Sequence, residues 1–191
     1  MAPGVIAGIV LAAGESRRMG QPKQLMVLGL RTMLQHVVDA AASSQLDQVY
    51  VVVGHRAEEV KASLAKREVK FIENSNYRDG LGSSVRAGVA ALPPDARAAM
   101  FLLGDQPFTT SELINQLLER STADNIVAAA LNGRRANPTL FGRKWFHELL
   151  RVSGDSGGRT IIEAHPEALV LVETTADLRD VDTPQDVTAL S

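Results

Sequence analysis

Short apolar runs alternate with amphipathic stretches along nearly the whole chain. The runs are rich in Val, Ile and Leu, and they cover Val5–Leu11, Val49–Val53, Val69–Ile72, Met100–Leu103, Ile126–Ala130 and Leu169–Val172. The first, second and fourth of these runs are continuously apolar, which is typical of strands buried on both faces. The pattern therefore predicts a sheet that is covered on both sides.

Helical patterns lie between the apolar runs. Met33–Ala41 carries one apolar stripe at helical spacing, and Thr109–Glu112 is typical of a capping box before a second stripe. Thr183–Asp186 places a cap, a proline and an acid at the start of a last helix. This alternation predicts the α/β class: a Rossmann-like three-layer α/β/α sandwich with a mostly parallel sheet, formed by residues 1–191 as a single domain.

The composition excludes several classes of protein. The 191 residues are 45% apolar and 22% charged, as in ordinary folded domains. A net charge of -2 provides no bulk field to attract a nucleic acid or an anionic membrane, so neither is expected as a partner. The chain has no cysteine, and its four histidines are scattered without HExxH spacing, which argues against disulfides, cysteine nucleophiles and zinc hydrolases.

The start of the chain does not have the charge order of an export signal. Val5–Ala13 is apolar, but no basic residue precedes it, and Arg17 and Arg18 follow it. No apolar run reaches the roughly 20 residues that a membrane helix needs. We therefore expect a cytoplasmic protein.

The segment after the first predicted strand combines small residues with cations. Ligands of parallel sheets bind beyond the carboxyl ends of the strands, where Leu11–Lys23 contains small residues, two glycines, Arg17, Arg18 and Lys23. Small residues let the backbone approach a ligand, and the cations can bind a polyphosphate. The spacing matches neither a Walker A loop nor GxGxxG. An ordinary strand-to-helix turn with solvated arginines is the alternative.

Two acidic positions are candidate metal ligands. Asp105 follows the run Met100–Leu103, and Mg²⁺ prefers one or two carboxylates together with phosphate oxygens. The first and fourth parallel strands have their carboxyl ends at the same edge of the sheet, so Asp105 and the cationic loop are expected to converge. Asp182 is the second candidate. A turn at Asp105 and a helix cap at Asp182 are the structural alternatives.

Three more polar segments have two interpretations each. Asn74–Gly88 is glycine-rich and then helical, so Ser83 and Ser84 either hydrogen-bond a ligand at a helix N-terminus or only cap that helix. Asn132–Pro138 is either a basic hairpin or part of a site. Gly154–Thr160 is either a flexible loop or part of a site.

Together these segments resemble the MobA-like NTP transferases, the superfamily that includes the molybdenum-cofactor guanylyl- and cytidylyltransferases. The resemblance runs from Leu11 to Asp186, and it rests on Leu11–Gly14, Ser16–Gly20, Lys23, Gly104–Pro107 and Asp180–Asp186. Leu-Ala-Ala-Gly and Asp-Gln-Pro resemble the cytidylyltransferase branch. Asn137–Phe141 and Gly154–Arg159 resemble segments that lie near the pterin-binding side of the enzymes in that branch.

The resemblance implies a fold of the nucleotide-diphospho-sugar transferase type. The activity it implies is a Mg²⁺-dependent transfer of CMP from CTP to the terminal phosphate of molybdopterin, with release of pyrophosphate. It implies catalytic roles for Arg18, Lys23 and Asp105, and metal binding by Asp105 and Asp182. The nucleotide-binding residues that it implies are Leu11, Ala12, Ala13, Gly14, Arg18, Lys23, Ser83, Ser84 and Gly104. The acceptor-binding residues are Asn137, Pro138 and Arg159.

Two departures from the family pattern concern the acceptor. Ala136 stands where relatives usually have glycine, and Asn137 often corresponds to histidine. Alternative acceptors are phospholactate and a sugar phosphate, and, because only a few loop atoms read the base, GMP transfer to the same cofactor is another alternative. A further alternative is a non-catalytic protein that binds the cofactor and delivers it to a client molybdoenzyme. The absence of a recognisable Ser-His or Cys-His pair agrees with catalysis by positioning and charge neutralisation.

Overall fold

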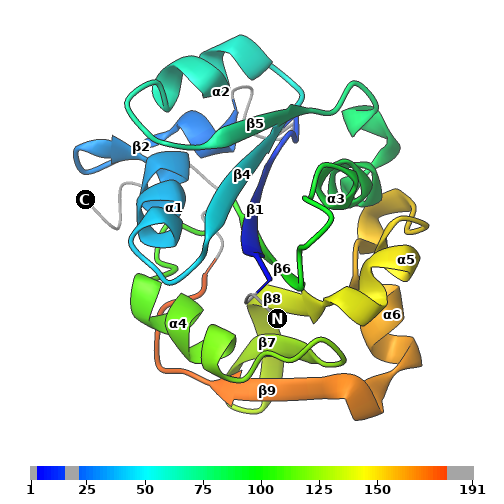
Figure 1. The fold of residues 1–191 in the computed structure, drawn as a ribbon. Coiled ribbons are helices and arrows are strands. Elements are labelled where there is room, and N and C mark those ends of the chain that lie inside the picture. Colours follow the sequence, from blue (N-terminus) through cyan, green and yellow to red (C-terminus); the bar gives the residue numbers. More distant parts are fainter. Residues whose placement is uncertain (1–3, 16–21, 180–191) are drawn as a thin grey trace.

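The computed structural model of the chain describes residues 4–15 and 22–179. These residues form three layers, with helices on both faces of a central sheet (Figure 1). The sheet has seven strands in the order β5-β4-β1-β6-β8-β7-β9. In chain order the strands are β1 (Ile6–Ala12), β4 (Gln48–Val53), β5 (Lys70–Glu73), β6 (Ala98–Leu103), β7 (Ile126–Leu131), β8 (Arg134–Gly142) and β9 (Leu169–Glu173).

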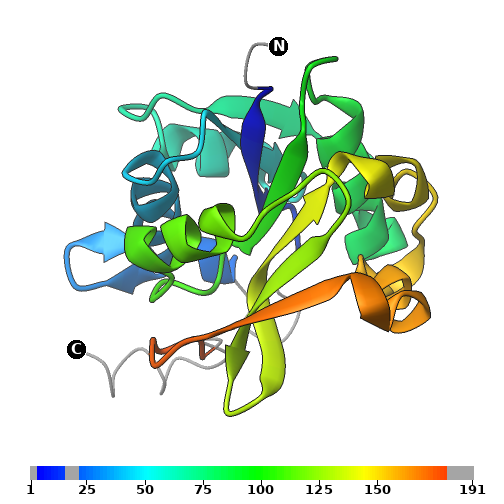
Figure 2. The ribbon, with the colours of Figure 1, turned by 60° about the horizontal axis from the view of Figure 1, so that its bottom comes forward.

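All strands of the sheet except β8 run in the same direction. β8 is antiparallel to both of its neighbours, β6 and β7, and β7 pairs in parallel with β9. Figure 2 shows β8 between these strands, joined to β7 by a hairpin. The hairpin turns at Asn132 and Gly133, which both have positive φ, as a type I′ hairpin turn requires. The prediction of a mostly parallel sheet is confirmed, and β8 is the strand that the apolar pattern did not predict.

The two faces of the sheet carry separate apolar layers. Helices α1 (Met33–Ala42), α2 (Ala57–Ser63) and α4 (Ser111–Glu119) cover one face. Helices α3 (Leu81–Ala90), α5 (Phe146–Leu149) and α6 (Arg159–Ala164) cover the other face (Figure 1). Alternate residues of β1 belong to the two layers, Val10 to the first and Ile9 and Leu11 to the second. β1 is therefore buried on both sides, as its uninterrupted apolar sequence predicts.

Some local predictions need correction. The N-cap of α4 is Thr110, whose hydroxyl accepts a hydrogen bond from the Leu113 N–H at 3.2 Å, one residue later than the predicted capping box places it. Gly154–Thr160 contains a 3-10 turn (Gly154–Ser156) and the first residues of α6. The predicted last helix at 183–186 lies outside the described residues. No helix in the described ranges is long and apolar enough to cross a membrane.

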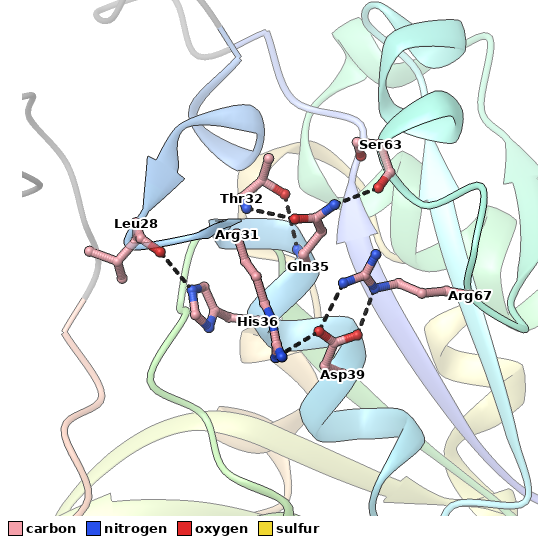
Figure 3. A network of polar contacts seen from close by, with 8 residues as sticks. All are labelled: Leu28, Arg31, Thr32, Gln35, His36, Asp39, Ser63 and Arg67. Carbon is pink, nitrogen blue, oxygen red and sulfur yellow. Dashed lines mark hydrogen bonds and ion pairs between the residues drawn. The ribbon is translucent and has the colours of Figure 1, made fainter.

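A polar network holds the segment before α1 against the rest of the fold (Figure 3). This segment contains a 3-10 turn (η1, Lys23–Leu25) and a small hairpin of β2 (Val27–Leu28) and β3 (Arg31–Thr32). Asp39 of α1 accepts hydrogen bonds from Arg67, at 2.6 and 2.9 Å, and from Arg31 at 3.1 Å. The hydrogen bond to Asp39 raises the pKa of Arg67. The network joins the hairpin, α1 and the segment after α2.

The N-terminus of α1 has a complete capping box. The Thr32 hydroxyl accepts from the Gln35 N–H at 3.2 Å, and the Gln35 side chain accepts from the Thr32 N–H at 2.9 Å. The Gln35 amide also donates to the Ser63 carbonyl at 2.7 Å. The same residues therefore cap α1 and attach it to the end of α2.

We expect Thr32→Ala to lower the free energy of unfolding by about 1 kcal/mol, because it removes the N-cap acceptor of α1. Urea denaturation measures the difference. Thr32→Ser is the matched control, since it keeps the hydroxyl, and it should retain most of the stability. Equal losses from the two substitutions would contradict the role of the hydroxyl.

Candidate functional site

A cleft of about 490 Å³ opens at the carboxyl ends of β1 and β6. The two strands are parallel neighbours, with Leu11 paired to Leu103, and the Gly104 N–H donates to the Leu11 carbonyl at 3.1 Å. The segments that follow these strands therefore start side by side. The lining comprises Leu11, Ala12, Ala13, Gly14, Glu15, Gln24, Tyr77, Arg78, Gly80, Leu81, Ser84, Leu103, Gly104, Asp105 and Asp155. The structure thus brings Asp105 and the first residues of the loop after β1 to one cleft.

The segment that carries Lys23 is attached to this cleft through its neighbour. Gln24 is buried and lines the cleft, and its side-chain amide donates to the Ala12 carbonyl at 3.1 Å. Lys23 is the first residue of η1 and is partly exposed; its side chain is not among those lining the cleft. Lys23 and Asp105 therefore lie at the same end of the sheet. The sequence did not indicate Gln24 as a site residue.

The two candidate serines of α3 have different surroundings. The buried Asn74 side-chain amide donates to both hydroxyls, at 2.9 Å to Ser83 and 3.0 Å to Ser84. Ser83 in turn donates to the Gly80 carbonyl at 2.8 Å and lines another cavity, on the β5 side of α3. Ser84 lines the cleft, and within the described residues its hydroxyl only accepts hydrogen bonds. Its hydrogen is thus the group that can donate to a ligand.

An ion pair joins two segments of the cleft wall. The Arg78 Nε lies 3.0 Å from a carboxylate oxygen of Glu15, which follows the small residues after β1. The Arg78 guanidinium also lies 5.5 Å from the centre of the Tyr77 ring. The hydrogen bond to Glu15 is the main reason that the pKa of Arg78 is raised. Tyr77 and Arg78 are lining residues that sequence reasoning missed, because their contact with the loop after β1 is tertiary.

A second cavity of about 230 Å³ adjoins the first. The two share Leu11, Leu81, Leu103 and Asp155. The second cavity is lined further by Val85, Phe101, Arg135, Ala136, Asn137, Thr139, Phe141, Ser156, Gly158, Arg159 and Ile162. Two of the three residues predicted to bind the acceptor, Asn137 and Arg159, thus lie in one cavity next to the cleft. Pro138 is buried beside them but is not part of the lining.

Close backbone packing shapes the boundary between the two cavities. Gly80 has φ +88° and ψ 179°, a conformation that is essentially restricted to glycine. A Cβ atom there would lie 2.5 Å from an Asp155 carboxylate oxygen and 2.7 Å from the Gly154 carbonyl oxygen. The turn before α3 and the Gly154–Ser156 turn are therefore in direct contact, and this contact positions Asp155 in both cavities.

Two predicted residues, Arg18 and Asp182, lie outside the described residues. Within the described ranges, no group of three or more His, Asp and Glu side chains forms a preformed metal site. Asp105 is a partly exposed carboxylate in the cleft. One carboxylate beside space for phosphate oxygens fits a hard divalent cation such as Mg²⁺, which takes part of its coordination from substrate phosphates.

Sequence comparisons relate this chain to nucleotidyltransferases. Residues 8–169 match the sequence model of the family described as MobA-like NTP transferase domain. A stretch of 178 residues is 32% identical to the bifunctional protein GlmU of Saccharophagus degradans, over 91% of this chain and 37% of that protein. The chain therefore spans about a third of the length of the curated relatives that it matches.

Solved structures share the fold over nearly the whole chain. Rv0371c from Mycobacterium tuberculosis superposes with a TM-score of 0.86 at 29% identity, covering 99% of this chain and 98% of that one. Its complex with manganese gives 0.81 at 27% identity, over 99% and 98% of the chains. A nucleotidyl transferase from Methanothermobacter, Mth528, gives 0.85 at 24% identity, over 97% and 95%. At that identity, the last match is evidence for the fold alone.

We expect Gly80→Ala to lower the free energy of unfolding by at least about 2 kcal/mol, because the new Cβ meets Asp155 and Gly154 in a strained backbone conformation. Gly133→Ala is the matched control. Gly133 also has a positive φ, +74°, but nothing lies within 4 Å of the added atom. The loss there should be about 1 kcal/mol, the cost of holding alanine in a left-handed backbone conformation. Equal losses in urea denaturation would contradict the close packing at Gly80.

Proposed function

Because the chain belongs to the family of MobA-like NTP transferase domains, we propose that it transfers CMP from CTP to the terminal phosphate of molybdopterin. The observation that carries the proposal is the pair of adjoining cavities at the carboxyl end of the sheet. Asp105 lines one cavity, and Arg159 lines the other together with several apolar side chains. We treat residues 1–191 as one nucleotidyltransferase domain, and we place the reaction in the cytoplasm, where nucleoside triphosphates are available.

The proposed reaction is a direct displacement at phosphorus. An oxygen of the acceptor phosphate attacks the α-phosphorus of CTP and forms a new phosphoanhydride bond. The bond from the α-phosphorus to the oxygen that bridges it to the β-phosphorus breaks, and pyrophosphate leaves with that oxygen. The attacking phosphate is already ionised at neutral pH, so the step needs no general base. Catalysis then depends on alignment of the two reactants and on neutralisation of their charge.

The nucleotide fits the larger cleft in this proposal. The small residues Ala12, Ala13, Gly14 and Gly104 let the backbone approach the ligand closely, and the Ser84 hydroxyl has a hydrogen to donate. Lys23 and Arg18 bind the triphosphate. The Lys23 backbone is held at this end of the sheet through the hydrogen bond of Gln24 to Ala12.

Asp105 and Asp182 would hold the divalent metal ion. A bound metal ion neutralises triphosphate charge and orients the phosphates. Mg²⁺ is our proposed ion, and the manganese complex of Rv0371c supports a divalent cation in this fold. Asp105, in the segment after β6, would supply a carboxylate oxygen beside cleft space for phosphate oxygens and water.

The acceptor fits the smaller cavity. Its lining includes Phe101, Phe141 and Ile162, which suit a flat organic body, while Asn137 and Arg159 supply polar contacts. This division supports a phosphorylated pterin over a small phosphorylated acid such as phospholactate, since the latter has little apolar surface to bury. The preference for CTP over GTP rests on the resemblance of the Leu11–Gly14 segment to the cytidylyltransferase branch.

The test is Mg²⁺-dependent release of pyrophosphate from CTP in the presence of molybdenum-loaded molybdopterin. We expect release with CTP that greatly exceeds release with GTP, and none without the acceptor. Greater turnover with GTP or a sugar phosphate would refute the proposed specificity while keeping the reaction class. Nucleotide binding without turnover for any acceptor, with cofactor affinity unchanged by Asp105→Asn, would instead identify a delivery protein.

We expect Lys23→Ala to lower turnover by at least about a hundredfold, because it removes a cation aimed at charge that develops on the phosphates. The thermal melting temperature should stay close to that of the wild type, since Lys23 lies outside the apolar layers. Lys66→Ala is the matched control, as Lys66 is exposed and does not line either cavity. A collapse of the melting temperature in Lys23→Ala alone would indicate a structural role.

A further inference from the structure

One residue of the smaller cavity, Arg135, was not predicted to bind the acceptor. Arg135, Asn137, Thr139 and Phe141 alternate along β8, and all four line this cavity. Ala136 lines the cavity as well, and β8 is irregular between Arg135 and Thr139, so the lining itself and not strand alternation places Arg135 at this cavity. Its neighbour Arg134 follows the hairpin turn and is not part of the lining.

The cavity lining, rather than the strand register, places Arg135 near the cleft. The pairing of β6 with β8 ends at Phe101 and Thr139. Between Thr139 and Arg135, β8 contains the cis Asn137–Pro138 bond and shifts its register against β7. Arg135 lines the smaller cavity together with Asn137 and Leu103, and Leu103 also lines the cleft. Arg135 therefore belongs to the cavity that adjoins the cleft.

Arg135 and Arg159 form a pair of like charges around this cavity. Burial lowers the pKa of Arg135, and the positive charge of Arg159 lowers it further, while Glu163 partly opposes the effect. Within the part of the chain that the structure describes, neither guanidinium has a carboxylate in an ion pair. Two neighbouring cations without a paired acid attract an anion that can contact both.

We propose that Arg135 and Arg159 together bind the phosphate group of the acceptor, so that this cavity selects phosphomonoesters with a flat or apolar body. The inference rests on the proposed nucleotidyl transfer and extends it to the acceptor class. The acceptor phosphate must approach a triphosphate of the same sign of charge. Guanidinium groups on the acceptor side offset this repulsion and fix the attacking phosphate by paired N–H···O hydrogen bonds.

Neopterin monophosphate and neopterin are suitable probes, because they share a fluorescent pterin and differ by the phosphate. In fluorescence titrations of the full chain, we expect Arg135→Ala to weaken binding of neopterin monophosphate roughly tenfold to hundredfold, the range for lost charge-assisted hydrogen bonds. Binding of neopterin and of CTP should stay within about twofold. Arg134→Ala, the matched control, removes the same charge from the neighbouring position and should change none of the three affinities by more than that.

Arg135→Lys separates the shape of the guanidinium from its charge, and it keeps the inference testable if the alanine variant is poorly folded. It should bind neopterin monophosphate with an affinity between those of wild type and Arg135→Ala. Equal weakening by Arg134→Ala and Arg135→Ala would overturn the inference, as would equal affinities of the wild type for neopterin monophosphate and neopterin.

The inference and the proposed function fail in different ways. Normal nucleotidyl transfer by Arg135→Ala, with an unchanged KM for the acceptor, would overturn the role of Arg135 and leave the proposed function intact. Arg135-dependent binding of neopterin monophosphate, together with no pyrophosphate release from any nucleotide, would overturn the proposed function and support the phosphate site.

Discussion

The parallel pairing of β1 with β6 is the constraint on which the rest of the site depends. Leu11 and Leu103 are register partners, and the Gly104 N–H adds a hydrogen bond to the Leu11 carbonyl beyond the ladder. Both strands lie inside the sheet, between β4 and β8. The loop after β1 and the segment that carries Asp105 therefore leave the sheet together. They cannot separate without breaking the central strand pair, whose side chains are buried on both faces.

Polar contacts then fix the loops that surround this pair. Gln24 attaches η1 to the Ala12 carbonyl, and the network around Asp39 holds the hairpin that follows η1 against α1. On the other side, Asn74 binds both serines at the start of α3. Binding residues in α/β proteins commonly lie on loops that a rigid scaffold positions. Here buried amide side chains add to this scaffold. They form hydrogen bonds with backbone groups and so position the walls of the cleft.

The strands that follow from local apolar patterns could be predicted from the sequence. The site residues that it missed are placed by tertiary contacts. The apolar runs predicted β1, β4 and β6 to within two residues at each end. They did not predict β8, because its first half, Arg134–Asn137, is mostly polar. Ser83 and Ser84 were predicted to act together, yet consecutive helical residues point about 100° apart, so only Ser84 lines the cleft. Gln24 and Arg78 gain their roles from partners at Ala12 and Glu15, which a linear reading does not bring together.

The distribution of charge in the cleft constrains what can bind there. Glu15, Asp105 and Asp155 line it with three carboxylates, and Arg78, the cation among the described lining residues, is paired with Glu15. A triphosphate entering this cleft alone would be repelled. A nucleotide in this cleft would therefore need added positive charge, and in the proposed function a divalent ion on Asp105 together with Lys23 would supply it at the phosphates. Because Asp155 lines both cavities, the proposed acceptor phosphate would need cations on its side as well.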